Sequence, residues 1–188
     1  MTIAILRPNA EGDLSQLYVF PSDGVHWNKV AEETPDEDAT YVHKYGGVIG
    51  SFYYDNYDLA NLGPGASITN VQVVARVRRI AQNPGGAYPT LIRLGVRISG
   101  SDYRSDNSVG GNSYVNTSRN YATNPDTGLA WTLADINSLQ ILLGLRMINM
   151  ALWQGGFISG RCTQTYVQVT YSAIVAPTAT TDPATEVT

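Results

Sequence analysis

The chain has 188 residues, of which 43% are hydrophobic and 15% are charged, and its formal net charge is −4. This length suits one all-β domain, and the acidic balance argues against a nucleic-acid-binding protein, which normally carries a basic patch. The charged fraction is below the roughly 25% of typical soluble domains. Low charge together with 18 glycines and 12 tyrosines favours a β-protein with wide uncharged surfaces, along which subunits commonly pack.

The start of the chain and its single cysteine bear on where the protein is made. Met1 leads into TIAILRPNAEGD, which has neither the basic start nor the long apolar core of a secretory signal. No stretch approaches the ~18 apolar residues of a transmembrane helix. Cys162 is the only cysteine, which excludes a disulfide within the chain. We expect a soluble protein made in a host cytoplasm, or a mature form without its leader, that acts without a membrane.

The first third of the chain alternates short apolar runs with turns. Residues 2–7 are apolar and β-branched, and they predict a terminal strand or arm. Residues 17–20 predict a short strand that ends at the turn residues of 21–24. Residues 34–38 form an acidic turn, and two tyrosine-dense strands are expected at 40–45 and 48–59.

The clearest strands are two alternating runs at 68–80 and 91–99. Alternation places apolar side chains on one face and polar side chains on the other, as in an antiparallel sheet covered on one side. In both runs arginines occupy the polar face. We expect the two runs to pair as a hairpin or as partners in one sheet, so that their arginines form one cluster on its outer face: Arg76, Arg78, Arg93 and Arg97.

The second half of the chain completes an all-β pattern. Residues 101–120 predict loop or edge strand, and 132–137 a short helix capped by Thr132. A buried strand is expected at 139–149 and a closing strand at 161–171. Short strands between glycine and proline turns predict a single antiparallel β-sandwich of jelly-roll type with one short helix and extended terminal arms. The expected division is a strand or arm at 1–8, the sandwich at 9–175 and a flexible tail at 176–188.

The residues that could support chemistry are few. His26 and His43 lack the spacing of a zinc site, and Cys162 has no neighbouring base in the sequence, so packing roles are expected for all three. The acidic turn at 36–38 offers calcium ligands, but without the spacing of an EF-hand, and solvated side chains are the simpler interpretation. We therefore expect a protein that is not an enzyme, with no metal and no cofactor.

Aromatic and arginine side chains provide the candidate interface. Tyrosines are crowded between residues 41 and 57, with Trp27 nearby in sequence, and such rings anchor protein interfaces or stack on sugar rings. Ten of the twelve basic residues are arginines, and arginine is enriched in interfaces. The predicted interface set is Trp27, Tyr53, Tyr54, Tyr57, Arg76, Arg78, Arg93 and Arg97.

Five segments resemble a β-sandwich domain of tailed-phage virion proteins and related metagenomic sequences: LRPNAEGD, PDEDATYV, VQVVARVRR, AWTLADINSL and TYVQVTY. The resemblance spans nearly the whole chain, from Leu6 to about Tyr171. It implies a structural part of a virion, such as capsid decoration or cement, or a collar, tail or fibre component. The matching segments mark core and turns, so no functional residue is carried over.

The function expected from the sequence is that of a non-enzymatic virion protein. It would assemble with itself and with other virion proteins through its sandwich surfaces and terminal arms, without nucleic acid or membrane. Two alternatives stay open. One is a carbohydrate- or receptor-binding module that uses the tyrosine-rich stretch, with a glycan as ligand. The other is an extracellular fibre subunit in which residues 2–6 are donated as a strand to a neighbour.

Overall fold

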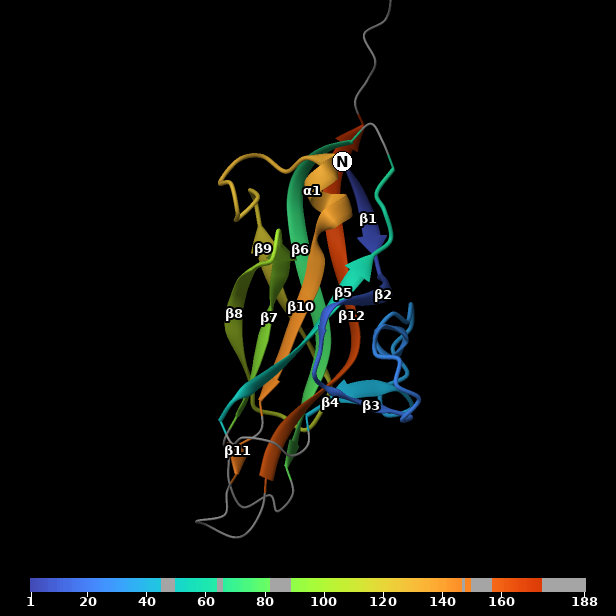
Figure 1. The fold of residues 1–188 in the computed structure, drawn as a ribbon, viewed down its shortest axis with the longest axis vertical. Helices are drawn as coiled ribbons and strands as arrows, with labels where there is room; N and C mark the ends of the chain where they lie inside the picture. The colour runs from blue at the N-terminus through green and yellow to red at the C-terminus, as the bar shows by residue number, and fades with distance from the viewer. Residues whose placement is uncertain (45–49, 64–65, 82–88, 147, 150–156, 174–188) are drawn as a thin grey trace, which may run out of the picture.

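Two antiparallel β-sheets pack face to face in the computed structural model of this chain (Figure 1). The structure describes residues 1–44, 50–63, 66–81, 89–146, 148–149 and 157–173. Sheet A has seven strands and sheet B has five. In the chain, one 3-10 turn lies between the strands Tyr18–Phe20 and Tyr41–His43, and one short α-helix lies between the strands Val115–Tyr121 and Gln140–Arg146. This architecture confirms the predicted all-β sandwich with a short helix.

Eight strands give the sandwich jelly-roll topology. In sheet A the order is β4-β12-β6-β9, and in sheet B it is β5-β10-β7-β8. Between most successive strands the chain crosses from one sheet to the other, and every registered pair is antiparallel, as in the two interleaved Greek keys of a jelly roll. The bounds are β4 Tyr41–His43, β5 Phe52–Leu59, β6 Ala66–Ala81, β7 Thr90–Ile98, β8 Ser101–Val109, β9 Val115–Tyr121, β10 Gln140–Arg146 and β12 Phe157–Ala173.

Four further strands extend this framework. The N-terminal segment, predicted as a strand or arm, is a strand that pairs with β12 from Thr2↔Tyr171 to Leu6↔Val167. The others pair with β5, β4 and β12 respectively. Their bounds are β1 Thr2–Leu6, β2 Pro8–Ser15, β3 Tyr18–Phe20 and β11 Ile148–Asn149, and the 3-10 turn η1 is Trp27–Lys29.

The alternation predicted for β6 and β7 is confirmed, but their expected pairing is wrong. In β6 the side chains of Val71, Val73, Ala75 and Val77 lie in the core, as expected. However, β6 belongs to sheet A, where it pairs with β12 and β9, whereas β7 belongs to sheet B. Alternation shows which side chains share a face of a strand, but it does not identify the neighbouring strand.

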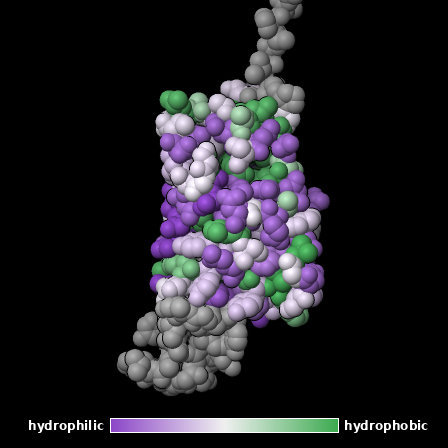
Figure 2. Space-filling model, in the orientation of Figure 1, coloured by the Kyte–Doolittle hydropathy of each residue, from purple (hydrophilic) through white to green (hydrophobic). Residues whose placement is uncertain are grey.

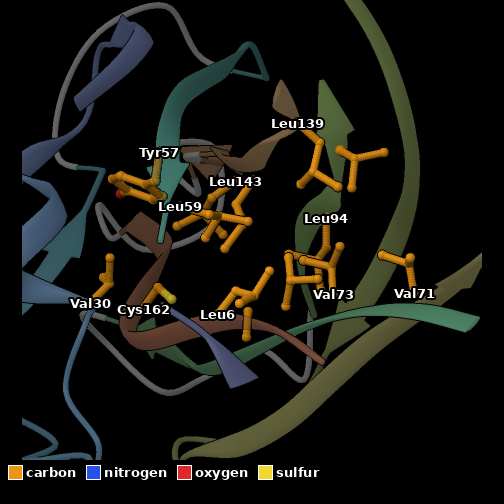
Figure 3. Close-up of a cluster of buried hydrophobic side chains, with 14 of the residues drawn as sticks. Leu6, Val30, Tyr57, Leu59, Val71, Val73, Leu94, Leu139, Leu143 and Cys162 are labelled. Atoms are coloured by element: carbon orange, nitrogen blue, oxygen red, sulfur yellow. The ribbon is translucent and has the colours of Figure 1, made fainter. Parts of the chain in front are cut away.

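The core fills the space between the two sheets (Figure 3). Sheet B contributes Leu94 from β7 and Leu143 from β10, and both are fully buried. Tyr57 of β5 is also fully buried, which corrects its predicted place in an interface, because a side chain inside the core cannot contact a partner. Cys162 is buried in the same cluster, in agreement with a packing role.

The predicted helix forms as α1, Leu133–Ser138. Thr132 is its N-cap, and its side chain accepts a hydrogen bond from the Asp135 backbone N–H. The Asp135 carboxylate accepts in return from the Thr132 N–H, which completes a capping box. Residues 101–120, expected as loop or edge strand, contain β8 and all but the last residue of β9, and these are edge strands of sheets B and A. The predicted tail at 176–188 lies outside the described residues.

Gly95 of β7 occupies a position where a side chain does not fit. A Cβ atom there would lie 2.0 Å from the Tyr103 carbonyl oxygen and 2.8 Å from the Arg104 Cα, both on the neighbouring strand β8. Backbone cannot move aside as a flexible side chain does. We expect Gly95→Ala to lower the free energy of unfolding by about 1–3 kcal/mol, measured by urea denaturation.

Gly110 provides the matched control, because a Cβ built there meets nothing within 4 Å. Gly110→Ala should leave the denaturation midpoint within about 0.5 kcal/mol of the original protein, as for ordinary surface changes. Equal losses in the two variants would show that the close approach of β7 and β8 does not limit stability.

Candidate functional site

The predicted interface residues do not form one surface. Arg76 and Arg78 lie on the outer face of sheet A, while Arg93 and Arg97 lie on the outer face of sheet B, so the expected single arginine cluster is wrong. Trp27 and Tyr53 are partly buried against the core. Of the predicted tyrosines, Tyr54 projects onto the sheet B face, where it contacts arginines.

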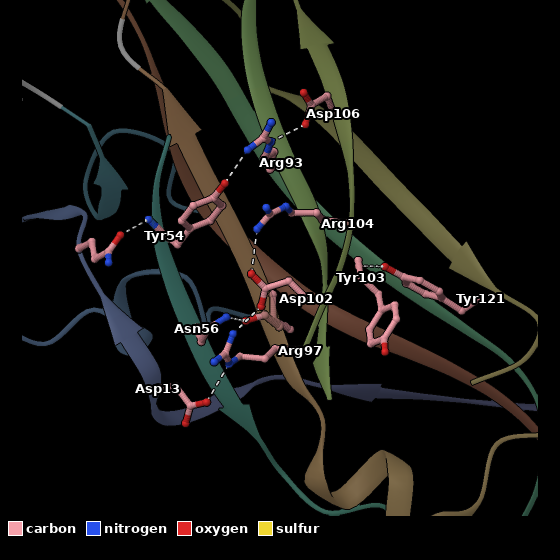
Figure 4. A network of polar contacts seen from close by, with 12 residues as sticks. Asp13, Tyr54, Asn56, Arg93, Arg97, Asp102, Tyr103, Arg104, Asp106 and Tyr121 are labelled. Carbon is pink, nitrogen blue, oxygen red and sulfur yellow. Dashed lines mark hydrogen bonds and ion pairs between the residues drawn. The ribbon is translucent and has the colours of Figure 1, made fainter. Parts of the chain in front are cut away.

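The outer face of sheet B holds a network of three arginines and three aspartates (Figure 4). Arg97 Nε lies 2.8 Å from Asp13 Oδ2, and Arg97 Nη1 lies 2.6 Å from Asp102 Oδ1. Arg104 Nη1 reaches the other oxygen of Asp102 at 2.8 Å. Each arginine charge is balanced within the subunit, so this face is a poor site for a polyanion.

A glycine in β10 allows an aromatic ring into the same network. Gly144 pairs with Tyr54 on one side and with Arg93 on the other, and a Cβ there would lie 2.6 Å from the Tyr54 ring. The ring therefore lies across Gly144, and Arg93 Nη1 donates to its hydroxyl at 2.7 Å. Arg93 also binds Asp106 at 2.7 Å and lies 3.8 Å from the centre of the Phe52 ring.

On sheet A the acidic turn neutralises arginines. Arg76 Nε donates to Glu37 at 2.8 Å, and Asp38 lies 2.8 Å from both Arg78 and Arg161. The Tyr114 ring packs beside Arg78, and its hydroxyl donates to Asp38 at 3.1 Å. These carboxylates, considered as calcium ligands in the sequence, are thus engaged by guanidinium groups. Within the described ranges, no group of three or more His, Cys, Asp or Glu side chains is arranged to bind a metal.

A buried carboxylate ties the N-terminal loops to sheet B. Asp55 of β5 is fully buried, and its Oδ1 accepts from the backbone N–H groups of Gln16 and Leu17 at 2.7 and 2.9 Å. Its Oδ2 contacts His26 Nδ1 at 2.6 Å and accepts from the Tyr57 hydroxyl at 3.1 Å. Four contacts on one carboxylate offset the cost of burying its charge. The hydrogen bond to Asp55 is the main reason that the pKa of His26 is raised.

The cysteine has the surroundings of a packing residue. Cys162 is fully buried, and this burial raises the pKa of its thiol to about 12. A thiol in that state holds its proton at neutral pH and is a weak nucleophile. The Cys162 thiol donates to the Gln164 carbonyl oxygen at 3.3 Å.

Four aromatic rings that the sequence did not single out as a set share the outer face of β3 and β4. We call Tyr18, Phe20, Tyr41 and His43 the aromatic platform. The β3–β4 register places Tyr18 opposite His43 and Phe20 opposite Tyr41. Ring centres are 5.9 Å apart in the first pair and 5.1 Å apart in the second, which is stacked at 14°. A cavity of about 340 Å³ is lined by Tyr18, Val19, Ser22 and His43.

Comparison with known proteins gives little context. No family model matches the chain, and no curated protein matches it. Among solved structures, the chain is similar to the enzymatically active domain of tailspike protein 4 from bacteriophage CBA120, with 10% identity and a TM-score of 0.39. The match covers 89% of this chain and 19% of that one, so this chain spans about a fifth of the tailspike chain. At that TM-score, the likeness carries no argument about function.

Among the described residues, no helix is long and apolar enough to cross a membrane.

The two histidines should affect the pH dependence of stability in opposite directions. The pKa of His26 is raised above the ~6.5 of an unfolded chain, so its stabilisation is complete below about pH 6.5 and is lost as pH rises through its folded-state value. Burial, Arg161 and Lys44 lower the pKa of His43 to about 4, so its contribution is lost as pH falls below about 6.5. We expect the free energy of unfolding, measured in urea, to decrease as pH rises above about 6.5.

His26→Asn keeps an N–H donor toward Asp55 but removes the titration, so this variant should show a flat profile from about pH 6.5 to about pH 8. Above that range the Cys162 thiol, whose pKa is raised by burial, should lower the stability of both the original protein and the variant as the thiol of the unfolded chain loses its proton at about pH 8.5. His43→Asn is the matched control and should keep the original decrease. A decrease from about pH 6.5 to about pH 8 that persists in His26→Asn would assign the pH dependence to another group.

Proposed function

We propose that this protein is a non-enzymatic structural subunit of a tailed-phage virion, and that it assembles with itself through the exposed edge of β1. The observation that carries the assembly is the apolar outer side of this edge strand. Ile3 and Ile5 are 58% and 43% exposed, whereas Ala4 and Leu6 between and beyond them face the core. The virion assignment follows from the sequence resemblance.

An exposed apolar edge strand is a template for pairing with another chain. In the described part of the chain, β12 is the one strand that pairs with β1. Natural proteins usually protect such an edge with charges, proline or a bulge. The edge strand TIAIL has none of these, because its register with β12 is continuous and all five residues are uncharged. Addition of a strand from a second copy would cover both the backbone groups and the isoleucines.

The broad faces of the sheets support assembly through edges. Six of their arginines form ion pairs with carboxylates of the same subunit, so these charges do not require a partner from another chain: Arg76, Arg78, Arg93, Arg97, Arg104 and Arg161. On the face shown in Figure 2, hydrophobic residues are scattered among hydrophilic ones. The same internal pairing supports the expectation that nucleic acid is not a partner, since a nucleic-acid surface needs cationic side chains available to phosphates.

The segments that resemble virion proteins form the framework of the sandwich. LRPNAEGD joins β1 to β2, and PDEDATYV contains the acidic turn that binds the sheet A arginines. VQVVARVRR is the central part of β6, and TYVQVTY lies in the C-terminal half of β12. AWTLADINSL contains the buried Trp131 and the capped helix α1. Because these segments build the core and the turns, they support a structural role in the virion. That role would be capsid decoration or a position in the collar, tail or fibre.

The alternative of strand donation has less support than edge pairing. Residues 2–6, the expected donor, already occupy sheet A of their own chain as β1. Donation would require them to leave this position and expose Leu6, which is 5% exposed and part of the core. Pairing between edges keeps β1 in place.

Assembly is tested by the mass of the protein in solution. Because association depends on protomer concentration, the mass is measured with the protein at about 50 µM. Light scattering should then give a multiple of the 20.3 kDa subunit mass. Ile3→Glu places a charge on the edge and should weaken association at least about tenfold, equivalent to about 1.4 kcal/mol. Electron micrographs of the original protein should show closed symmetric particles.

Leu129→Glu is the matched control, because Leu129 is 69% exposed and lies outside the sheets. It should leave the mass unchanged, and both variants should keep the original unfolding midpoint. A monomer for the original protein, or equal loss of assembly in the two variants, would refute the proposal.

A further inference from the structure

The aromatic platform lies on the outer face of sheet A, and two of its four rings are exposed. Tyr18 and Phe20 are 51% and 45% exposed, whereas Val19 between them is buried in the core. Exposed apolar side chains that are grouped on one face are candidates for contact with a partner or ligand. Because β3 ends the order of sheet A, both rings stand at the border of the sandwich.

Neighbouring side chains hold the rings of the platform in place. Tyr41 is 7% exposed, with the Phe20 ring stacked 5.1 Å away and the Arg161 guanidinium 4.1 Å from its ring centre. His43 meets Tyr41 edge-on at 5.3 Å. A ligand that stacks on Tyr18 or Phe20 therefore loses little to the ordering of the protein, which favours binding.

The adjoining cavity adds a pocket with polar groups. Its volume of about 340 Å³ is close to the lower end of ligand pockets, roughly 300–1,000 Å³. Tyr18 and His43 contribute aromatic walls with polar tips, and Ser22 contributes a hydroxyl. The Ser22 hydroxyl donates to the Val19 carbonyl at 3.3 Å, so its oxygen remains able to accept. The site thus joins flat apolar faces to hydrogen-bonding groups at their edge.

The charges around the pocket favour a neutral ligand. Burial lowers the pKa of His43 to about 4, so at neutral pH its ring is uncharged, with one donor and one acceptor nitrogen. The nearest lysine, Lys44, is 4% exposed, and its ammonium lies 3.3 Å from the centre of the Tyr53 ring and 4.9 Å from that of Tyr18. This cation is covered by aromatic rings, so it is not presented to an anion.

We propose that the aromatic platform binds a neutral hexose unit of a glycan, stacked on Tyr18 and Phe20 with its hydroxyls directed to Ser22 and His43. A pyranose ring has an apolar C–H face and an edge of hydroxyls, which matches the flat rings and polar tips of the site. One alternative from the sequence is a sugar-binding module that uses the tyrosine-rich stretch. In that stretch Tyr57 is buried and Tyr54 is engaged by Arg93, so the proposed site uses Tyr41 of the stretch together with the exposed rings of β3.

The test uses the full chain on an array of neutral and acidic glycans, followed by calorimetric titration with the neutral glycan that gives the highest signal. The original protein should bind neutral glycans. Tyr18→Ala and Phe20→Ala should each weaken binding about tenfold, or about 1.4 kcal/mol, with an unchanged unfolding midpoint, because both rings are exposed. Tyr18→Leu keeps an apolar side chain without a ring face and should also lose most of the affinity.

Tyr54→Ala is the matched control, since it removes a tyrosine from the outer face of the other sheet and should leave the affinity unchanged. The proposal is overturned if the original protein binds no glycan, binds acidic glycans alone, or binds equally well after the platform changes. It is also overturned if Phe20→Ala alters the assembled mass but not glycan binding, since the platform is then a subunit contact. Binding that persists in Ile3→Glu would separate this site from assembly through β1.

Discussion

The antiparallel pairing of β6 with β12 is the interaction on which the other parts of the structure depend. These are the longest strands, with 16 and 17 residues, and their register extends from Ile158↔Ala81 to Ala173↔Ala66. On its other side β12 pairs with β4 near Cys162 and with β1 beyond Val167. The edge strand β1 and the β3–β4 ribbon are therefore both positioned by one long strand. Loss of this pairing would remove the support of both surfaces at once.

Ion pairs within the subunit explain the high arginine content in a different way from the interface predicted from the sequence. Arginine forms bidentate contacts and stacks on rings, and these properties suit interfaces between subunits. Here the same properties are used within one subunit, where Arg97 bridges Asp13 and Asp102 and Arg161 covers Tyr41. Partly exposed pairs of this kind contribute little to stability individually, about 0–1 kcal/mol each. These ion pairs matter more for the surface than for stability, because they make the outer faces of the sandwich polar while leaving little net charge on them.

The sequence predicted local structure better than it predicted surfaces. Alternation identified the core face of β6, and the Thr132 cap located helix α1, because both signals lie within a few residues. Partners across sheets are set by the long connections of the jelly roll, so β6 and β7 were wrongly expected to pair. In β5, the buried Asp55 interrupts the apolar pattern, and it accepts the hydrogen bond of the Tyr57 hydroxyl, which satisfies that polar group inside the core. The three-residue strand β3 is too short for a clear pattern, so its exposed rings were missed.

The loop between β3 and β4 keeps the two proposed surfaces apart. This loop contacts β12 at the point between its pairing with β4 and its pairing with β1. The contact is a hydrogen bond of 2.8 Å from the Thr165 N–H to the Val30 carbonyl. The Gln164 side chain also donates to the carbonyls of Glu32 and Glu33, at 2.7 and 3.0 Å. A strand added at β1 would therefore stop at the loop. Since the platform lies beyond it, on the outer face of β3 and β4, assembly through β1 would leave the rings accessible, and one subunit could join an assembly while presenting a sugar site.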